Sequence, residues 1–240
     1  MLRTCGHLFA MLIIPVFVFD GDHRPNNKHG QSIRKNTTTR EIELQHLLDV
    51  FSFEWRQAPG EAEAELASMS KAGIIDGVLS KDSDALIFGA THDQSTFNVA
   101  VYDSLLCGLT MDDMMFIALL AKGDYGPGLA GCSARTALEL LQAGFSRSLL
   151  HAIDTMDPGH LGPFLDVWRN ELKNELCTNN SGMLSSRHPG LANAIPNDYP
   201  TAADFRVLGL YREPLVSPHV GSCTPHALVH WNLMKPARLA

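Results

Sequence analysis

The sequence predicts an α/β fold with a mostly parallel sheet flanked by helices. Two short apolar segments, residues 15–19 and 74–79, have the β-branched and aromatic character of buried strands, and helical patterns alternate with them. Alternation of strand and helix is the pattern of a parallel sheet covered by helices. The composition agrees, because 45% hydrophobic and 19% charged residues suit a globular chain of 240 residues with an apolar core.

The individual elements can be taken in chain order. Strands are expected at residues 15–19, 74–79 and 96–102, the first two fully buried. Helices are expected at residues 42–51, 60–72, 111–122 and 133–143. The second helix is the best defined, because Pro59 and several acids precede or open it and Gly73 follows its end. Residues 22–31 are polar and rich in turn formers, so we expect a loop there.

The last third of the chain gives a weaker pattern. Residues 151–176 can hold one or two helices, whereas residues 178–225 are rich in Pro, Ser, Asn and Gly. We therefore expect loops or a partly ordered tail after residue 178. We divide the chain at residues 1–110, 111–177 and 178–240.

The net charge of -7 comes from one segment. Residues 59–124 carry 3 basic and 11 acidic side chains, while the parts before and after are nearly neutral. A solvated acidic face is one interpretation, and a carboxylate cluster that needs cations is the other. Proteins that coat nucleic acid are usually basic, so any nucleic-acid function here must explain the acidity locally.

The cysteines and the apolar pattern exclude several classes. Five widely spaced cysteines without a C-x-x-C motif make a disulfide framework or a cysteine zinc site improbable and favour a reducing intracellular compartment. No run of about 18 apolar residues is present, so we expect no membrane partner.

Acidic side chains follow the ends of the two best-defined expected strands. Asp20 comes directly after the first strand, and Asp82 and Asp84 follow the second. In open parallel sheets the functional crevice lies outside the carboxyl ends of the strands, so these three carboxylates are expected at one rim. The ordinary alternative is that each Asp is a turn residue or a helix cap.

Further acids open the helix after Pro59 and follow the helix at 111–122. Glu61 and Glu65 share a helical face, whereas Glu61 and Glu63 can serve one site only if Glu61 lies in an irregular first turn. Periodicity leaves both pairs open. Asp124 follows in the sequence Lys-Gly-Asp-Tyr.

Carboxylates that converge need counterions, and Mg²⁺ prefers such oxygen ligands. Two such ions roughly 4 Å apart would support phosphodiester hydrolysis.

A glycine-rich hairpin connects the expected helices at 111–122 and 133–143. Its sequence, GPGLAG at residues 126–131, can expose backbone N–H groups that hold a phosphate. A plain turn between two helices explains the same residues equally well.

With these residues in place, the chain resembles the XPG/flap-endonuclease superfamily of structure-specific nucleases. The matching stretches are PVFVFDG (15–21), QAPGEAEAELA (57–67), GVLSKDSDALIFG (77–89) and ALLAKGDYGPGLAGCSARTALELL (118–141). The short stretch between Gly30 and Gln57 resembles the GEN-like, Holliday-junction-resolving subgroup more than the flap endonucleases with a long helical arch. The resemblance implies a PIN-like nuclease core within residues 1–110 and a helix-hairpin-helix (H2TH-like) DNA-binding element within residues 111–177.

The resemblance also implies roles for individual residues. The metal-binding acids would be Asp20, Glu61, Glu63, Asp82, Asp84 and Asp124, with Glu65 either solvated or behind the ligands. Lys28, with Arg34 or Lys35, would contact the scissile phosphate and the incoming strand. The hairpin from Gly128 through Gly131 to Arg135 would hold the duplex backbone, with K⁺ as a candidate bound ion. The implied cofactors are two Mg²⁺ ions, replaceable by Mn²⁺, the partner is flapped or branched DNA, and the implied location is the nucleus.

The chain departs from the family pattern at its beginning. The family has an earlier strand with another metal-binding Asp, but residues 1–19 contain no Asp or Glu, so the resemblance implies an N-terminally incomplete nuclease. Two alternatives follow. One is a catalytically impaired nuclease-like protein that binds branched DNA. The other is a haloacid-dehalogenase-type phosphatase built on the Asp-x-Asp pattern of Asp20 and Asp22, which leaves the other acids unexplained.

Overall fold

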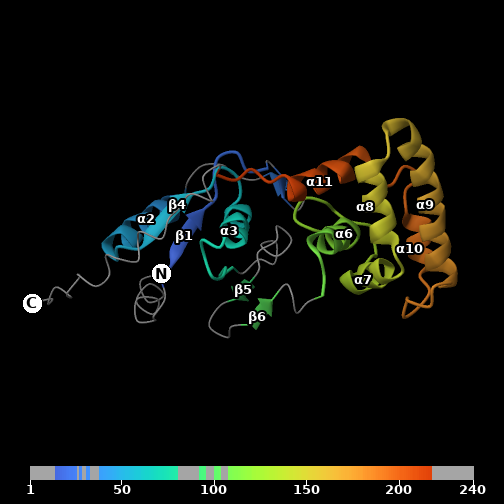
Figure 1. Ribbon diagram of the computed structural model, residues 1–240, viewed down its shortest axis with the longest axis horizontal. Helices are drawn as coiled ribbons and strands as arrows, with labels where there is room; N and C mark the ends of the chain where they lie inside the picture. The colour runs from blue at the N-terminus through green and yellow to red at the C-terminus, as the bar shows by residue number, and fades with distance from the viewer. Residues whose placement is uncertain are drawn as a thin grey trace, which may run out of the picture.

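The computed structural model describes residues 14–25, 27–28, 31–32, 38–80, 92–95, 100–103 and 108–217. The molecule is elongated, with a parallel pair of strands and its crossover helix at one end and a helical region at the other (Figure 1). Helix α3 (Ala62–Lys71) and the hairpin of β5 (His92–Ser95) and β6 (Ala100–Asp103) lie between these two ends. The predicted α/β class is therefore confirmed, although the described sheets are small.

A parallel pair of strands supports the first half of the chain. Strand β1 (Val16–Phe19) pairs with β4 (Glu54–Gln57) in a register that sets Phe19 opposite Gln57. Helix α2 (Thr39–Val50) precedes β4 in the crossover that a parallel pair requires. A small apolar cluster joins them, with Leu48 and Phe53 buried at its centre. Strand β1 is only half-buried, so the expectation of full burial was wrong.

Helix α3 (Ala62–Lys71) follows β4 after a short turn, as predicted. Gly73 ends this helical segment with a φ of 68°, a left-handed conformation that glycine adopts without strain. The predicted strand at 74–79 is wrong, because only Val78 forms a strand-like bridge there. Two bends, at Ile74 and Asp76, interrupt the extended chain before it can pair.

Among the described residues, four further strands form two short hairpins. Strands β2 (Asn27–Lys28) and β3 (Gln31–Ser32) pair antiparallel inside the region expected to be a loop. Strands β5 (His92–Ser95) and β6 (Ala100–Asp103) form a second antiparallel pair. The strand predicted at 96–102 therefore overlaps β6, and residues 96–99 lie outside the described residues.

The helical region surrounds the main apolar core. Helix α6 (Met111–Ala121) begins with a capping box between Thr110 and Asp113, and α7 (Ala134–Gln142) begins at the cap Ser133. Helices α8 (Phe145–Thr155) and α9 (Pro158–Thr178) follow, where one or two helices were expected. The core includes Met115, Phe116, Leu120, Leu140, Leu149, Trp168, Leu172 and Leu176, and it reaches Ala64 and Ala67 of α3.

Two helices occupy the segment that was expected to be loops. They are α10 (Pro189–Ala194) and α11 (Ala202–Arg212). Helix α11 has a capping box between Thr201 and Asp204 and buries Tyr211 in the main core. Arg212 forms ion pairs with Asp112 of α6 and Asp154 of α8, so contacts distant in sequence hold α11 in place. Within the described ranges, none of the helices combines the length and the apolar character needed to cross a bilayer.

Candidate active site and hairpin

Asp20 lies where β1 ends and α3 begins. Its Oδ1 accepts a hydrogen bond from the backbone N–H of Ala62 at 2.9 Å, across 42 positions of sequence. Its Oδ2 lies 2.6 Å from Nη1 of Arg24, which forms an ion pair with it. Its backbone carbonyl accepts from Nε2 of Gln57 at 3.1 Å. The carboxylate therefore lies at the positive end of a helix, where negative charge is favoured.

Backbone hydrogen bonds between two loops fix this position. The N–H of Ala58 donates to the carbonyl of Phe19 at 2.8 Å, and the N–H of Gly21 donates to the carbonyl of Gly60 at 2.7 Å. Gly21 is required here, because a Cβ on it would lie 1.9 Å from the carbonyl oxygen of Ala58. The loops after two parallel strands are thus joined at one edge, although the second of these strands is β4, which was not predicted, and not the expected strand at 74–79.

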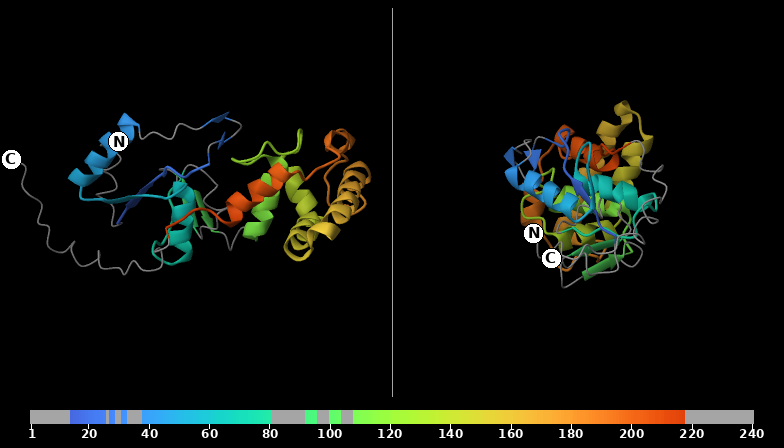
Figure 2. Two further views of the ribbon diagram at one scale, coloured as in Figure 1. Left: turned by 90° about the horizontal axis from the view of Figure 1, so that it is seen from above. Right: turned by 90° about the vertical axis from the view of Figure 1, so that its left-hand side faces the viewer.

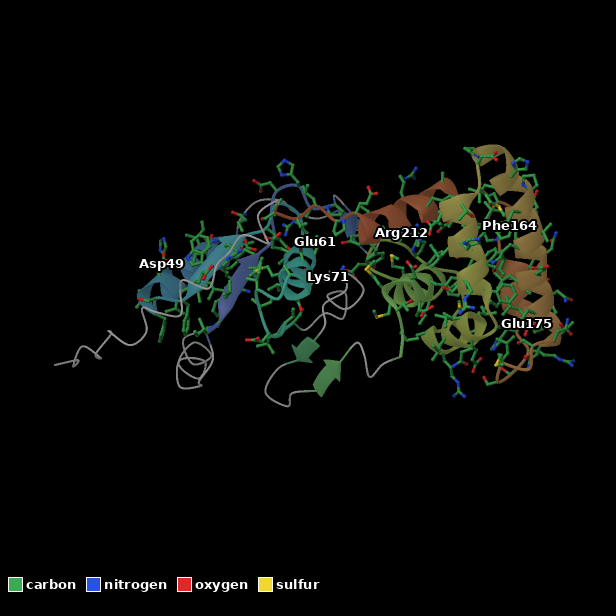
Figure 3. All side chains as sticks on the ribbon, in the orientation of Figure 1. Asp49, Glu61, Lys71, Phe164, Glu175 and Arg212 are labelled. Carbon is green, nitrogen blue, oxygen red and sulfur yellow. The ribbon has the colours of Figure 1, made fainter. Side chains whose placement is uncertain are left out.

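Glu61 is the N-cap of α3, with extended backbone angles of φ -87° and ψ 142°. It directly precedes Ala62, whose N–H binds Asp20, so the two candidate acids occupy one end of α3. Figure 3 shows Glu61 at the end of α3 that faces the loop after β1. Glu61 therefore lies outside the regular helix, as it must if it serves one site with Glu63 in the first turn. Glu61 is 5% exposed.

Glu65 behaves differently from the acids before it. Its side chain is fully buried, so the solvated alternative for this residue was wrong. Its Oε2 accepts a hydrogen bond from the backbone N–H of Ser217 at 2.8 Å.

Asp124 follows α6 in the helical region and is 6% exposed. The neighbouring Gly123 is close to α11, because a Cβ on it would lie 2.8 Å from Oη of Tyr211. Asp82 and Asp84 lie outside the described residues. In the part of the chain that the structure describes, no group of three His, Cys, Asp or Glu side chains could hold a metal ion. The carboxylate of Asp20 thus binds the N-terminus of α3 at Ala62, the residue after Glu61, and Glu63 lies in the first turn of that helix.

The hard carboxylate oxygens of Asp20 and Glu61 are of the kind that Mg²⁺ binds. Both oxygens of Asp20 already accept hydrogen bonds, but each keeps a further lone pair for a ligand bond. The donor chemistry of this pair therefore fits a hard divalent cation. The pair alone is not a complete ligand set.

The candidate DNA-binding residues are distributed between two places. Lys28 lies in strand β2, and Arg34 and Lys35 lie outside the described residues. The others lie in the hairpin between α6 and α7. Gly128 has a φ of 65°, and a Cβ on it would lie 2.3 Å from the backbone nitrogen of Lys122, so only glycine fits. Gly131 has a φ of 85°.

The hairpin presents the N-terminal turn of α7 and the side chain of Arg135. The Arg135 side chain is 78% exposed, and its Nε donates to Oε1 of Glu139 at 3.1 Å. Burial by itself would raise the pKa of Glu139, but hydrogen bonds from Ser185 and the charge of Arg135 outweigh it and lower that pKa. A charged Glu139 therefore holds one edge of the guanidinium and leaves the rest of it toward solvent.

Sequence reasoning missed Arg24 and Glu139 as partners of the candidate residues. Arg24 lies four positions after Asp20, inside a segment that was interpreted only as a polar loop. Glu139 lies one helical turn after Arg135, a spacing at which opposite charges meet on one face. That spacing was a usable signal for Glu139. The loop around Arg24 offered no comparable periodicity.

Comparisons with known proteins find flap endonucleases and DNA repair proteins similar to this chain. The family model of the XPG I-region matches residues 52–124. Flap endonuclease 1 of Methanoregula boonei is 27% identical over 164 residues, which are 60% of this chain and 49% of that protein. Flap endonuclease GEN homolog 1 of Homo sapiens is 32% identical over 120 residues, 45% of this chain and 13% of that protein. The chain thus spans about half or less of the length of these relatives.

Two solved nuclease structures have a fold similar to that of this chain. The Holliday junction-resolving enzyme GEN1 in complex with product DNA and Mg²⁺ has a TM-score of 0.68 and 30% identity, covering 90% of this chain and 51% of that one. The catalytic core of Rad2 in complex with DNA substrate has a TM-score of 0.66 and 29% identity, covering 93% of this chain and 70% of that one. The predicted nuclease fold is confirmed.

Proposed function

Because the chain belongs to the XPG/flap-endonuclease superfamily of structure-specific nucleases, we propose that it hydrolyses phosphodiester bonds in 5′-flap or branched, Holliday-type DNA. The reaction would serve DNA repair or recombination and would depend on Mg²⁺, with Mn²⁺ able to replace it. The observation that carries the proposal is the contact of Asp20 with the N-terminus of α3, directly beside Glu61. Two acids from separate parts of the sequence thereby meet at one edge of the fold.

The proposed metal ligands are Asp20, Glu61, Glu63, Asp82, Asp84 and Asp124. Bound Mg²⁺ would supply an activated water and stabilise the leaving oxygen of the phosphodiester. The N-terminus of α3 orients the Asp20 carboxylate, because an N–H at the positive helix end donates to it. Lys28, Arg34 and Lys35 would orient the scissile phosphate and the incoming strand by their positive charge.

The hairpin between α6 and α7 is the proposed site for the duplex backbone. Gly128 leaves no room for a side chain, Gly131 has a left-handed φ that favours glycine, and Arg135 adds a solvent-exposed positive charge. Contacts of this kind position DNA without reading its sequence, so selectivity would be for junction shape. One of the similar solved structures is of GEN-1 with potassium, and we propose K⁺ as an ion for this hairpin.

We propose that three regions of the chain have separate roles. Residues 1–110 would supply the nuclease core, 111–177 the helix-hairpin-helix region, and 178–240 a C-terminal segment that includes α10 and α11. A nuclear location is proposed on the relationship to a yeast protein named as a DNA repair protein.

A second function is favoured by one observation, the ion pair between Arg24 and Asp20. An Arg24 guanidinium bound to Asp20 opposes the binding of a metal ion by that carboxylate. The alternative is therefore that the chain binds DNA but has little nuclease activity. In that case the hairpin would still hold branched DNA, because phosphate contacts do not require the acidic cluster.

Cleavage of labelled 5′-flap and four-way-junction DNA in Mg²⁺ and in Mn²⁺ tests the proposal. We expect cutting by the unmodified chain and a loss of about two orders of magnitude or more in Asp20→Asn and Asp82→Ala, since a lost ligand costs several kcal/mol of transition-state stabilisation. Glu171→Gln, an exposed acid on α9, is the matched control.

Other outcomes would select the alternatives. Junction-selective retention without cutting in either metal would favour the DNA-binding protein. Turnover of a phosphomonoester that needs Asp20 but tolerates Asp82→Ala would favour the phosphatase.

A further inference from the structure

A fully buried carboxylate joins α3 to the end of the described chain. Glu65 lies on the buried face of α3, two positions after Glu63. Its Oε2 accepts from the backbone N–H of Ser217, which lies 152 positions later in the sequence. Its Oε1 has no hydrogen-bond partner among the described residues. Burying a carboxylate is costly, so the single bond to Ser217 carries much of the compensation for this charge.

Glu65 holds residues 213–217, the C-terminal strap. It follows α11 and runs back from the helical region to α3 (Figure 2). The Leu215 side chain is 51% exposed, so burial of that side chain does little to fasten the strap. The hydrogen bond to Glu65 and the partly buried Val216 are therefore its main attachments near α3.

The strap also contacts the residue that precedes Glu61. A Cβ on Gly60 would lie 2.9 Å from the carbonyl oxygen of Leu215, so the backbone of the strap packs directly against the backbone of Gly60. Glu61 follows Gly60 directly and caps α3. A shift of the strap would therefore reach the N-terminal end of α3, where Glu61 and Asp20 meet.

At its other end the strap continues from a helix that is firmly held. Arg212 at the end of α11 pairs with Asp112 of α6 and Asp154 of α8. Helix α6 in turn leads into the glycine-rich hairpin. The strap is thus a short connection between the helix that carries two candidate metal ligands and the helices next to the candidate DNA-binding hairpin.

We propose that Glu65 is a positioning residue, which fastens the C-terminal strap to α3 and so fixes Glu61 and Glu63 relative to the DNA-holding hairpin. The proposal rests on the proposed nuclease function. Loss of the bond would leave DNA bound by the hairpin but would misplace the scissile phosphate against the acids. The rate of the chemical step would fall while binding of DNA persists.

Four variants separate this role from general stability. Glu65→Met keeps an unbranched side chain of similar length but removes the acceptor, whereas Glu65→Gln keeps a carbonyl oxygen that can accept from Ser217. Ser217→Pro removes the donor and leaves Glu65 in place, and Ser217→Ala keeps the backbone N–H as its control. Hydrogen exchange of the strap amides and single-turnover cleavage kinetics are measured on each full-length variant.

We expect Glu65→Met and Ser217→Pro to lower the protection of the strap amides at least about tenfold. In the same variants the rate of cleavage should fall roughly 10- to 100-fold, with the KM for junction DNA changed by less than about twofold. Glu65→Gln and Ser217→Ala should retain most of the protection and most of the rate.

Unchanged exchange of the strap in Glu65→Met and Ser217→Pro would overturn the proposal. So would faster exchange with an unchanged cleavage rate, or a defect confined to DNA affinity. If the unmodified chain cuts no DNA, the proposed function fails, and the exchange measurement alone still decides whether Glu65 holds the strap.

Discussion

Nη1 of Arg24 lies 2.6 Å from Oδ2 of Asp20, and both residues belong to the loop that follows β1. The pair places a fixed positive charge on the carboxylate that we propose as a metal ligand. A guanidinium and a divalent cation compete for the same oxygen, because each neutralises the same charge. Arg24 therefore sets how easily Asp20 can take a metal.

The first prediction concerns this competition. Arg24→Gln should raise the affinity of the chain for Mn²⁺ roughly fivefold or more, a coupling of the usual size between two charged ligands of one site. Titration calorimetry with Mn²⁺ measures the effect. Arg40→Gln, which removes an exposed arginine of α2, is the control and should leave the affinity unchanged. An equal or lower affinity in Arg24→Gln would show that Arg24 does not compete.

The second prediction concerns the joined loops that hold Asp20. Gly21→Ala would place a Cβ 1.9 Å from the carbonyl oxygen of Ala58, so the loops must separate or the chain must strain. We expect a loss of stability of about 1–3 kcal/mol, the usual cost of overpacking. Thermal unfolding measures it as a lower Tm.

A glycine in open space provides the control for that substitution. A Cβ added to Gly162 of α9 would meet no other atom within 4 Å, and alanine favours a helix over glycine. Gly162→Ala should therefore keep or raise the Tm. A Tm of Gly21→Ala equal to that of the unmodified chain would contradict the geometry of the joined loops.

Local signals were sufficient for the elements that carry the site. Strand β1, helix α3 and helix α6 could be predicted, because their apolar spacing, first-turn acids and terminal residues act over a few positions. The contact of Asp20 with the start of α3 was not predicted from the strand-end rule, which joined Asp20 only to Asp82 and Asp84; the resemblance alone placed Asp20 and Glu61 in one site.

Contacts between distant segments account for what could not be predicted. Helix α11 was missed because its stability depends on distant partners: Arg212 pairs with Asp112 of α6, and Tyr211 packs against Tyr125 between α6 and α7. The sequence left open whether Glu65 is solvated or lies behind the ligands, because its partner Ser217 is far along the chain. The expected strand at 74–79 failed for a different reason, since only Ile75 and Val78 pack against the core and bends at Ile74 and Asp76 interrupt the extended chain.

The third prediction concerns the contact between the hairpin and the DNA backbone. Arg135→Ala should weaken binding of junction DNA and reduce the slope of log affinity against log salt by about 1, the value for one lost phosphate contact. Fluorescence anisotropy over a range of salt concentrations measures both quantities. Arg40→Ala is the control, because α2 lies at the opposite end of the molecule from α7 (Figure 1). An unchanged salt slope in Arg135→Ala would remove Arg135 from the interface.

The last prediction concerns Glu139, whose pKa lies below its ordinary value of 4.5 because hydrogen bonds from Ser185 and the charge of Arg135 outweigh its burial. A carboxyl with a lowered folded-state pKa stabilises the fold above its unfolded pKa, and this contribution is lost as the pH falls through the folded pKa. Glu139→Gln should therefore have a lower Tm than the unmodified chain at pH 7. The difference should shrink as the pH falls from about 4.5, the ordinary value, through the lower pKa of Glu139 in the folded chain. Thermal unfolding from pH 7 to pH 3 measures it, and Glu171→Gln on the exposed face of α9 should show no such trend. A Tm difference that stays constant over this range would mean that the charge of Glu139 contributes nothing to holding Arg135 and Ser185 together.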